Sequence, residues 1–157
     1  WEAIKRAEKA ARGENDTPAS ALDGVPPALP ALAQALAISK RAVRVGFEWP
    51  AVEGVLEKII EEAREVAEAE SQPALESEIG DLLFSVVNLA RWRQIDPESA
   101  LRATNARFKQ RFQQMEALAG QQGKQFTELS LEEMERLWNI AKAQQISGSR
   151  PVGRQTE

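Results

Sequence analysis

Two helix-spaced groups of carboxylates are the residues of this chain best suited to chemistry. The first lies in the run Glu61-Glu62-Ala63-Arg64-Glu65, and the second in Glu78-Ile79-Gly80-Asp81. A spacing of three residues places two side chains on one helical face. If the two faces meet, at least four acids gather, and like charges that close are unfavourable without a cation between them. Hard divalent cations with oxygen ligands, above all Mg²⁺, fit this requirement, so the spacing predicts a metal site.

The helix expected from 74 to 94 strengthens this prediction. Glu78, Asp81, Ser85 and Asn88 form one narrow polar stripe on it, and apolar residues cover most of the remaining circumference. A helix with so much apolar surface is expected to be mostly buried. No Lys or Arg stands three or four residues from Glu78 or Asp81 to serve as a local partner. Because buried carboxylates are costly unless they are paired or bind metal, the stripe favours a metal site.

A simpler interpretation also fits the helix expected over 51–70. Glu is a good helix former, and Arg64 can pair with Glu61 and Glu68, so its acids could be a solvated face. Downstream, Arg107 and Arg111 share a face at a spacing of four, as do Trp138 and Lys142. These residues suit a phosphate chain. The arginines could equally solvate the outside of a helix, and Trp138 could be core.

Composition bounds the remaining chemistry. The chain has 157 residues, a length typical of one domain, and it contains no Cys and no His. Disulfides, thiolate metal sites and imidazole catalysis are therefore excluded. A formal net charge of −4 argues against binding to nucleic acid. No apolar run approaches the ~20 residues of a membrane span, so we expect a cytoplasmic protein that makes no membrane contact. Trp1 is not an initiator Met, which indicates a piece of a longer protein.

The elements that must position these residues are all predicted to be helices. Periodic segments rich in Ala, Leu, Glu, Arg and Gln are separated by Pro- and Gly-containing breaks, and no strand pattern is convincing. Ser130-Leu-Glu-Glu133 is a capping box that opens the last helix. We expect one domain over 1–146, with 1–29 as an N-terminal helix and loop extension and 147–157 as a disordered tail. Helices are expected over 1–12, 30–45, 51–70, 74–94, 98–119 and 131–145.

Several stretches together resemble the MazG family of nucleoside triphosphate pyrophosphohydrolases. The family pattern E-E-x-x-E followed by E-x-x-D matches the two acid groups, and the resemblance extends from Trp1 to about Gln145. Further matching stretches are Val45-Gly-Phe-Glu-Trp49, the segments 20–32 and 80–91, Asn105-Ala-Arg-Phe-Lys-Gln-Arg-Phe112 and Leu137-Trp-Asn-Ile-Ala-Lys142. In this order, the motifs are highly specific together.

The resemblance implies an all-α helical bundle of the all-α NTP pyrophosphohydrolase type, completed by dimerisation. It implies hydrolysis of a nucleoside triphosphate to the monophosphate and pyrophosphate, with Mg²⁺, or Mn²⁺ in its place, as cofactor. The implied metal ligands are Glu62, Glu65, Glu78 and Asp81. The candidate catalytic residues are Glu61, as base for a water activated by the metal, and Glu62. The candidate substrate-binding residues are Lys58, Asn88, Arg107, Arg111 and Lys142, with Trp138 near the nucleoside.

The expected role is broad-specificity removal of unwanted nucleotides from the pool. Two alternatives remain open: a related all-α pyrophosphohydrolase specific for dUTP, dCTP or phosphoribosyl-ATP, and a helical dimerisation module without turnover. The module should have lost some of the four ligand acids, and all are present.

The extent of apolar surface on two of the expected helices also favours a homodimer, apart from the family resemblance. The helices expected over 51–70 and 74–94 carry more apolar surface than the other helices of one chain can cover, and a two-fold interface would bury the rest. We expect Leu83 in the core, and we expect Val87→Glu to weaken both assembly and stability.

Overall fold

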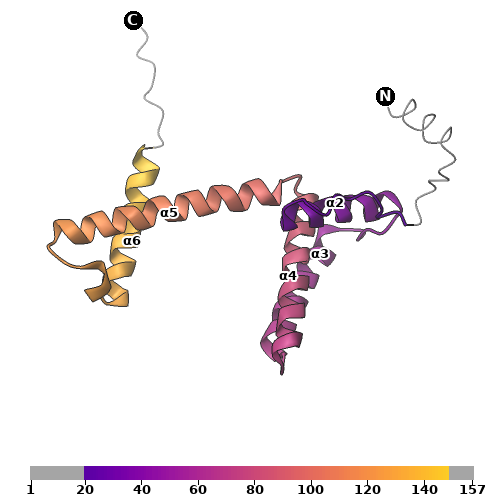
Figure 1. Cartoon of the computed structure of the whole chain (residues 1–157), viewed down its shortest axis with the longest axis horizontal. Coiled ribbons are helices and arrows are strands. Elements are labelled where there is room, and N and C mark those ends of the chain that lie inside the picture. Colours follow the sequence, from indigo (N-terminus) through magenta and orange to yellow (C-terminus); the bar gives the residue numbers. More distant parts are fainter. Residues whose placement is uncertain (1–19, 149–157) are drawn as a thin grey trace, which may run out of the picture. The chain divides into compact units, whose positions relative to one another are not determined.

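The described part of the protein is built from helices alone. The computed structural model describes residues 20–148. Within that range the chain forms five α-helices and one 3-10 turn, η1, and no strand (Figure 1). The bounds are α2 Ala31–Arg44, α3 Val52–Glu68, α4 Gln72–Trp92, α5 Pro97–Gln121, η1 Phe126–Glu128 and α6 Leu131–Gly148. The all-α prediction is confirmed.

Two predicted segments fall partly or wholly beyond this range. The helix expected over 1–12 lies outside the described residues. Helix α6 runs to Gly148, past the expected end near 145, and the rest of the predicted tail also lies outside them.

The chain divides into two compact units at Glu98 and Ser99. The first unit holds α2, α3 and α4, and the second holds nearly all of α5 together with η1 and α6. A single domain over 1–146 stays a prediction. None of the helices in the described range has the length and apolar character needed to cross a membrane.

Helix α4 begins and ends where local chemistry dictates. Ser71 caps its start by accepting a hydrogen bond from the backbone N–H of Ala74 at 3.3 Å, and Pro73 occupies the first turn. The helix ends at Trp92, and two residues later Gln94 adopts a positive φ of 58°. The expected bounds of 74 and 94 therefore lie within two residues of those observed.

Helix α2 ends in a glycine turn that directs the next residues toward the other helices. Gly46 has a φ of +90°, a conformation that glycine adopts without strain. The following Trp49 lies against the first turn of α3 at Gly54, where an added Cβ would come within 2.6 Å of the Trp49 ring. Glycine at position 54 is thus what lets the indole lie on α3.

Helices α3 and α4 lie side by side in the first unit (Figure 1). Val55 of α3 and Val87 of α4 are each only 1% exposed. Leu83, in contrast, is 53% exposed in the single chain. The prediction that Leu83 lies in the core is therefore wrong for the single chain, because a helical wheel gives the width of an apolar surface but not which arc of it the neighbouring helices cover.

The second unit has its own core, in which α5 packs on η1 and α6. Its buried residues are Met115, Ala119, Leu129, Leu137 and Ala141, with Trp138 packed against them. The predicted capping box is present: Ser130 N–H donates to Glu133 at 2.9 Å, and Glu133 N–H donates to the Ser130 hydroxyl at 3.3 Å. This reciprocal pair explains why α6 starts at Leu131.

Candidate functional site

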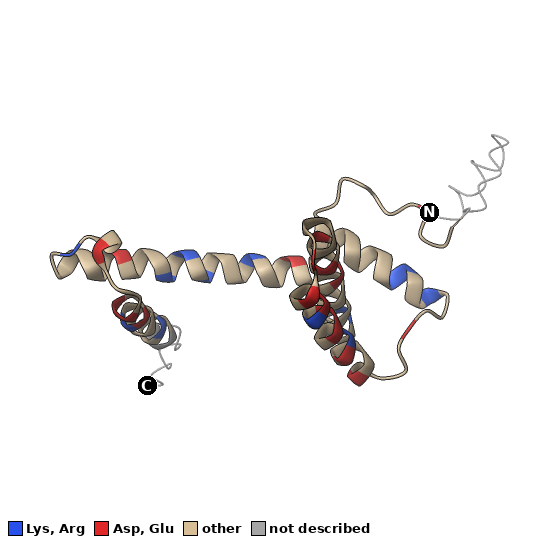
Figure 2. Cartoon of the chain, turned by 90° about the horizontal axis from the view of Figure 1, so that it is seen from below, with Lys and Arg blue, Asp and Glu red and all other residues tan. Residues whose placement is uncertain are grey.

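Three acids from two helices converge in the first unit. Glu62 comes from α3, and Glu78 and Asp81 come from α4. Each offers one carboxylate oxygen to a group whose atoms all lie within 4.8 Å of one another. Asp and Glu residues, coloured red, recur along the helices of the first unit (Figure 2). The predicted meeting of the two acidic faces is therefore observed for these residues.

Glu62 is the most informative of the three because it is buried. It is 3% exposed, and its Oε1 forms an ion pair with Lys58 Nζ at 2.6 Å. Its Oε2 has no hydrogen-bond partner among the residues that the structure describes. A buried carboxylate oxygen without a partner is costly, and a cation among the three acids would satisfy it. A donor set made only of carboxylate oxygens fits a hard divalent cation.

Lys58 bridges two neighbouring acids of α3. Its ammonium contacts Glu62 and also Glu61, the latter at 3.0 Å. The hydrogen bond to Glu62, followed by that to Glu61, raises the pKa of Lys58 above its usual value. Glu61 itself is exposed. The lysine thus supplies positive charge to Glu62 in the metal-free protein.

Glu65 lies within the electrostatic field of the acid cluster, although it is exposed. Desolvation raises the pKa of its carboxyl, and repulsion from Glu62 raises it further; Glu78 adds to this effect. The predicted fourth ligand is therefore not one of the three converging acids, but its charge already interacts with theirs.

A cavity of about 430 Å³ adjoins the acids within the first unit. Lys58, Glu62 and Asp81 line it, and along α4 the lining continues past Ser85 to Asn88. Seven residues of helix separate Asp81 from Asn88, which corresponds to roughly 10 Å. Aromatic and aliphatic side chains, including Ile38, Phe47, Trp49 and Phe84, supply much of the remaining lining. The lining of the cavity therefore combines these acids with a largely apolar wall.

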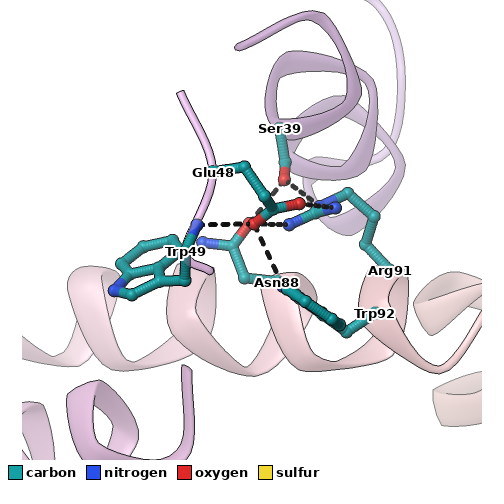
Figure 3. A network of polar contacts seen from close by, with 6 residues as sticks. All are labelled: Ser39, Glu48, Trp49, Asn88, Arg91 and Trp92. Carbon is teal, nitrogen blue, oxygen red and sulfur yellow. Dashed lines mark hydrogen bonds and ion pairs between the residues drawn. The ribbon is translucent and has the colours of Figure 1, made fainter. Parts of the chain in front are cut away.

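A polar network organised by Glu48 adjoins the cavity, whose lining includes its members Ser39, Asn88 and Arg91 (Figure 3). Arg91 contacts both carboxylate oxygens of Glu48, at 2.7 and 2.5 Å. The Trp49 backbone N–H and the Trp92 indole N–H also donate to Glu48, each at 3.0 Å. Burial raises the pKa of Glu48, but the hydrogen bonds and charge of Arg91 with the Trp49 N–H outweigh it, so the net pKa is lowered. Glu48 is therefore held as a carboxylate.

The network continues from Arg91 to a buried pair of polar side chains. Arg91 Nε donates to the Ser39 hydroxyl at 2.8 Å, and that hydroxyl donates to Asn88 Oδ1 at 2.5 Å. Asn88 was predicted to bind substrate. No role was predicted for Glu48, Arg91 or Ser39, although Glu48 and Arg91 stand in the motif stretches 45–49 and 80–91. The missing signal is tertiary, since Ser39 is 49 residues from Asn88.

The other predicted phosphate- and nucleoside-binding residues belong to the second unit. Arg111 Nε donates to Gln145 at 2.8 Å, and its guanidinium lies 5.4 Å from the centroid of the Trp138 ring. Arg107 donates to the Thr104 hydroxyl at 2.8 Å, and Lys142 is exposed. Arg111 and Trp138 are thus neighbours, and the roles of all four predicted residues stay predictions.

Comparison with known proteins relates the chain to nucleotide pyrophosphohydrolases. Residues 51–115 match the family model of the MazG nucleotide pyrophosphohydrolase domain. The chain is 44% identical over 142 residues to the nucleoside triphosphate pyrophosphohydrolase/pyrophosphatase MazG of Thermotoga maritima, which is 90% of this chain and 54% of that protein. It is 42% identical over 151 residues to the nucleoside triphosphate pyrophosphohydrolase of Escherichia coli K12, which is 93% of this chain and 56% of that protein. The chain therefore spans about half the length of these relatives.

Proposed function

We propose that this chain, residues 51–115 of which match the MazG nucleotide pyrophosphohydrolase domain, hydrolyses nucleoside triphosphates at the α–β phosphate bond in the presence of Mg²⁺. The products are the nucleoside monophosphate and pyrophosphate, and the range of nucleotides is broad. Glu62 is the observation that carries the proposal. A carboxylate 3% exposed, with one oxygen unpartnered in the described structure and two further acids beside it, is a site built for a cation.

The acids would hold the metal, and the cations would hold the substrate. Glu62, Glu78 and Asp81, with Glu65 beside them, are the proposed Mg²⁺ ligands. When bound, Mg²⁺ neutralises phosphate charge and polarises the phosphoryl group. Lys58 is the proposed contact to the phosphate chain in this unit, since its ammonium lines the cavity beside the acids. Arg107, Arg111 and Lys142 are further proposed contacts to the phosphates of the substrate.

Glu61 is the proposed base for the attacking water. Its carboxylate is exposed, and Lys58 bridges it to Glu62. That bridge keeps Glu61 on the same face as the acid cluster, where it can accept a proton from a water molecule beside the phosphate. No histidine or cysteine is present to do so in its place.

Pyrophosphate release from a panel of triphosphates tests the function. We expect turnover with Mg²⁺, loss of turnover in excess EDTA, and recovery when Mg²⁺ is restored. Asp81→Asn should lower kcat/KM by at least about a hundredfold, because removal of a ligand weakens both metal binding and charge stabilisation. Glu57→Gln is the matched control, since Glu57 is an exposed acid of α3 outside the cavity. Undiminished turnover in EDTA, or in Asp81→Asn, would refute the proposed chemistry.

We also propose that the protein acts as a homodimer joined through α3 and α4. Large apolar side chains remain 41–53% exposed on these two helices of the single chain: Leu56, Ile60, Ile79, Leu83 and Val86. Those on α4 recur at spacings of four and three, so they share one helical face. Soluble monomers seldom leave such contiguous surface uncovered, and a second copy is the simplest cover.

A further inference from the structure

A short turn over residues 20–24 separates part of the cavity of the first unit from solvent. Two of its residues, Ala21 and Leu22, line the cavity of about 430 Å³. Both are nevertheless exposed, Leu22 to 41%. A side chain that lines a cavity and also meets solvent lies at the edge of that cavity. The turn 20–24 is therefore an outer wall, whereas α4 contributes buried lining residues such as Ser85.

The turn 20–24 is braced by hydrogen bonds among its own residues. The Ser20 N–H donates to the Asp23 carboxylate at 2.9 Å, and the Asp23 N–H donates back to the Ser20 carbonyl at 3.1 Å. The Leu22 N–H donates to the Ser20 hydroxyl at 3.2 Å. These three bonds join only residues of the turn to one another. The turn can therefore move as one piece without losing any of them.

Arg41 of α2 ties the turn 20–24 to the helices. Its guanidinium donates to two backbone carbonyls of the turn, that of Asp23 and that of Gly24, the latter at 3.2 Å. Within residues 20–148, the polar contacts between the turn and the helices of the first unit come from Arg41 alone. A planar guanidinium can bridge two oxygens at once, which the ammonium of a lysine does poorly. One side chain therefore fastens the turn to α2.

Gly24 is the joint at which the turn can swing. Its φ of +80° is a conformation that L side chains rarely adopt, and an added Cβ would lie 3.4 Å from a guanidinium nitrogen of Arg41. The segment that follows is stiffer, because Pro26 and Pro27 have a fixed φ and the Leu29 N–H donates to the Pro26 carbonyl at 3.3 Å. Rotation of the turn relative to α2 is therefore easiest at the glycine.

We propose that the turn 20–24 is a lid on the cavity, latched to α2 by Arg41 and hinged at Gly24. Ligands enter and leave when the latch opens, and in the closed state Leu22 helps to exclude water from the acids that line the same cavity. Arg41 is thus a positioning residue. The proposal rests on the proposed function only for the identity of the ligand, since movement of the lid can be measured without any nucleotide.

A fixed wall is the alternative to a lid. Buried side chains would hold such a wall, but residues 20–24 are all exposed, and Leu22 is the only large apolar side chain among them. Segments with few buried contacts are the ones that open locally while the rest of the protein stays folded. Loss of the charged hydrogen bonds of Arg41 should shift the ratio of open to closed turn by about tenfold. A change of that size is measurable.

A single introduced cysteine reports how often the lid opens, because the chain has no cysteine of its own. Ser85→Cys places a thiol in the cavity lining at a position 6% exposed. In EDTA and without nucleotide, Arg41→Ala should speed its reaction with N-ethylmaleimide about tenfold. Arg41→Lys, which keeps the charge but not the planar fork, should fall between. Arg44→Ala is the matched control, since Arg44 is an exposed arginine in the same last turn of α2.

A second reporter separates opening of the lid from unfolding. Val55→Cys places its thiol at a position 1% exposed in the same unit but outside the cavity lining, so it reacts only when the unit unfolds. Its labelling rate should be the same with Arg41 and with Arg41→Ala. Gly24→Ala strains the closed turn by another route and should also speed labelling of Ser85→Cys. Unchanged labelling of Ser85→Cys in Arg41→Ala, or equal acceleration of both thiols, would overturn the lid.

Release of a nucleotide distinguishes failure of the lid from failure of the proposed function. With Mg²⁺ present, Arg41→Ala should raise the dissociation rate of an uncleavable α,β-methylene nucleoside triphosphate about tenfold, measured by stopped-flow tryptophan fluorescence. Turnover by the wild type together with thiol labelling that ignores Arg41 would overturn the lid and keep the function. Labelling that depends on Arg41 in a protein without turnover would support the lid and refute the enzyme activity.

Discussion

Glu62 and Lys58 show at the scale of single residues how the metal-free protein tolerates a buried acid. The lysine satisfies one oxygen of the carboxylate, at 2.6 Å, and leaves the other without a described partner. Breaking a buried pair leaves an uncompensated charge, so an ammonium four residues away on the same helix face is a strong local solution. The remaining oxygen is what a metal ion would engage. The site is therefore partly neutralised before any cation binds.

Glu65 provides a pH-dependent prediction for the metal-free protein. Desolvation and the charge of Glu62 raise its pKa, so the ionised form destabilises the folded state. The penalty is absent below the unfolded pKa of about 4.3 and grows as pH rises through the higher folded pKa. Glu65→Gln should therefore stabilise the EDTA-treated protein at pH 7, and the difference should vanish near pH 4.

Urea unfolding midpoints at the two pH values measure this effect. Glu68→Gln is the control, because Glu68 is an exposed acid on the same helix outside the converging group. A variant less stable than the wild type at pH 7 in EDTA would show that Glu65 has no unfavourable interaction with the cluster. Saturating Mg²⁺ should reverse the order, because the wild type then gains a ligand that the variant lacks.

The capping box that opens α6 carries the prediction at the scale of an element. The Lys124 hydrogen bond, followed by the Ser130 backbone N–H, lowers the pKa of Glu133 to about 2. A lowered pKa adds stability above the unfolded pKa of about 4.3 and loses it as pH falls through the folded value. Glu133→Ala should therefore lower the thermal midpoint at pH 7, and the difference from wild type should narrow between pH 4 and pH 2.

Helical circular dichroism on heating is the measurement. Glu132→Ala removes a neighbouring exposed acid from the same first turn without touching the capping box. Glu132→Ala should lose the same favourable interaction with the helix dipole as Glu133→Ala, but it should keep the hydrogen bonds of the capping box. Equal destabilisation by the two variants at pH 7 would mean that the box adds nothing beyond the dipole.

At the scale of the whole molecule, Leu83 and Val87 have different expected roles. Val87 is 1% exposed, so Val87→Ala should cost roughly 1–3 kcal/mol as a core truncation at any protein concentration. Leu83 is 53% exposed in the single chain and lies on the face proposed for the dimer. Leu83→Glu should therefore act on assembly, and the wild-type thermal midpoint should rise with protein concentration.

Sedimentation equilibrium across micromolar concentrations checks assembly directly. We expect a dimer for the wild type and for Val87→Ala, and a shift to monomer for Leu83→Glu. Glu57→Lys, an exposed substitution on α3, controls for a change of charge alone. A wild type that sediments as a folded, active monomer would rule out the dimer and leave the metal site unaffected.

Local sequence determined the elements and the meeting of the acids. Capping at Ser71 and Ser130 and the glycine turn at Gly46 act within a few residues, so helix ends were predicted closely. Helical spacing likewise put Glu78 and Asp81 on one face of α4. Their approach to Glu62 was predictable because both faces carried acids that needed a common cation, and the structure shows the three together.

Only the tertiary structure decided which apolar arc of α4 is covered and how the polar network beside the cavity is organised. Val87 and Leu83 are equally apolar on a wheel, and the choice between them depends on where neighbouring helices pack. Glu48, Arg91, Ser39 and Asn88 meet across as many as 52 residues of chain, and no spacing rule links them. Helical periodicity encodes which side chains share a face, whereas contact between faces depends on the packing of whole helices, to which every residue of the unit contributes.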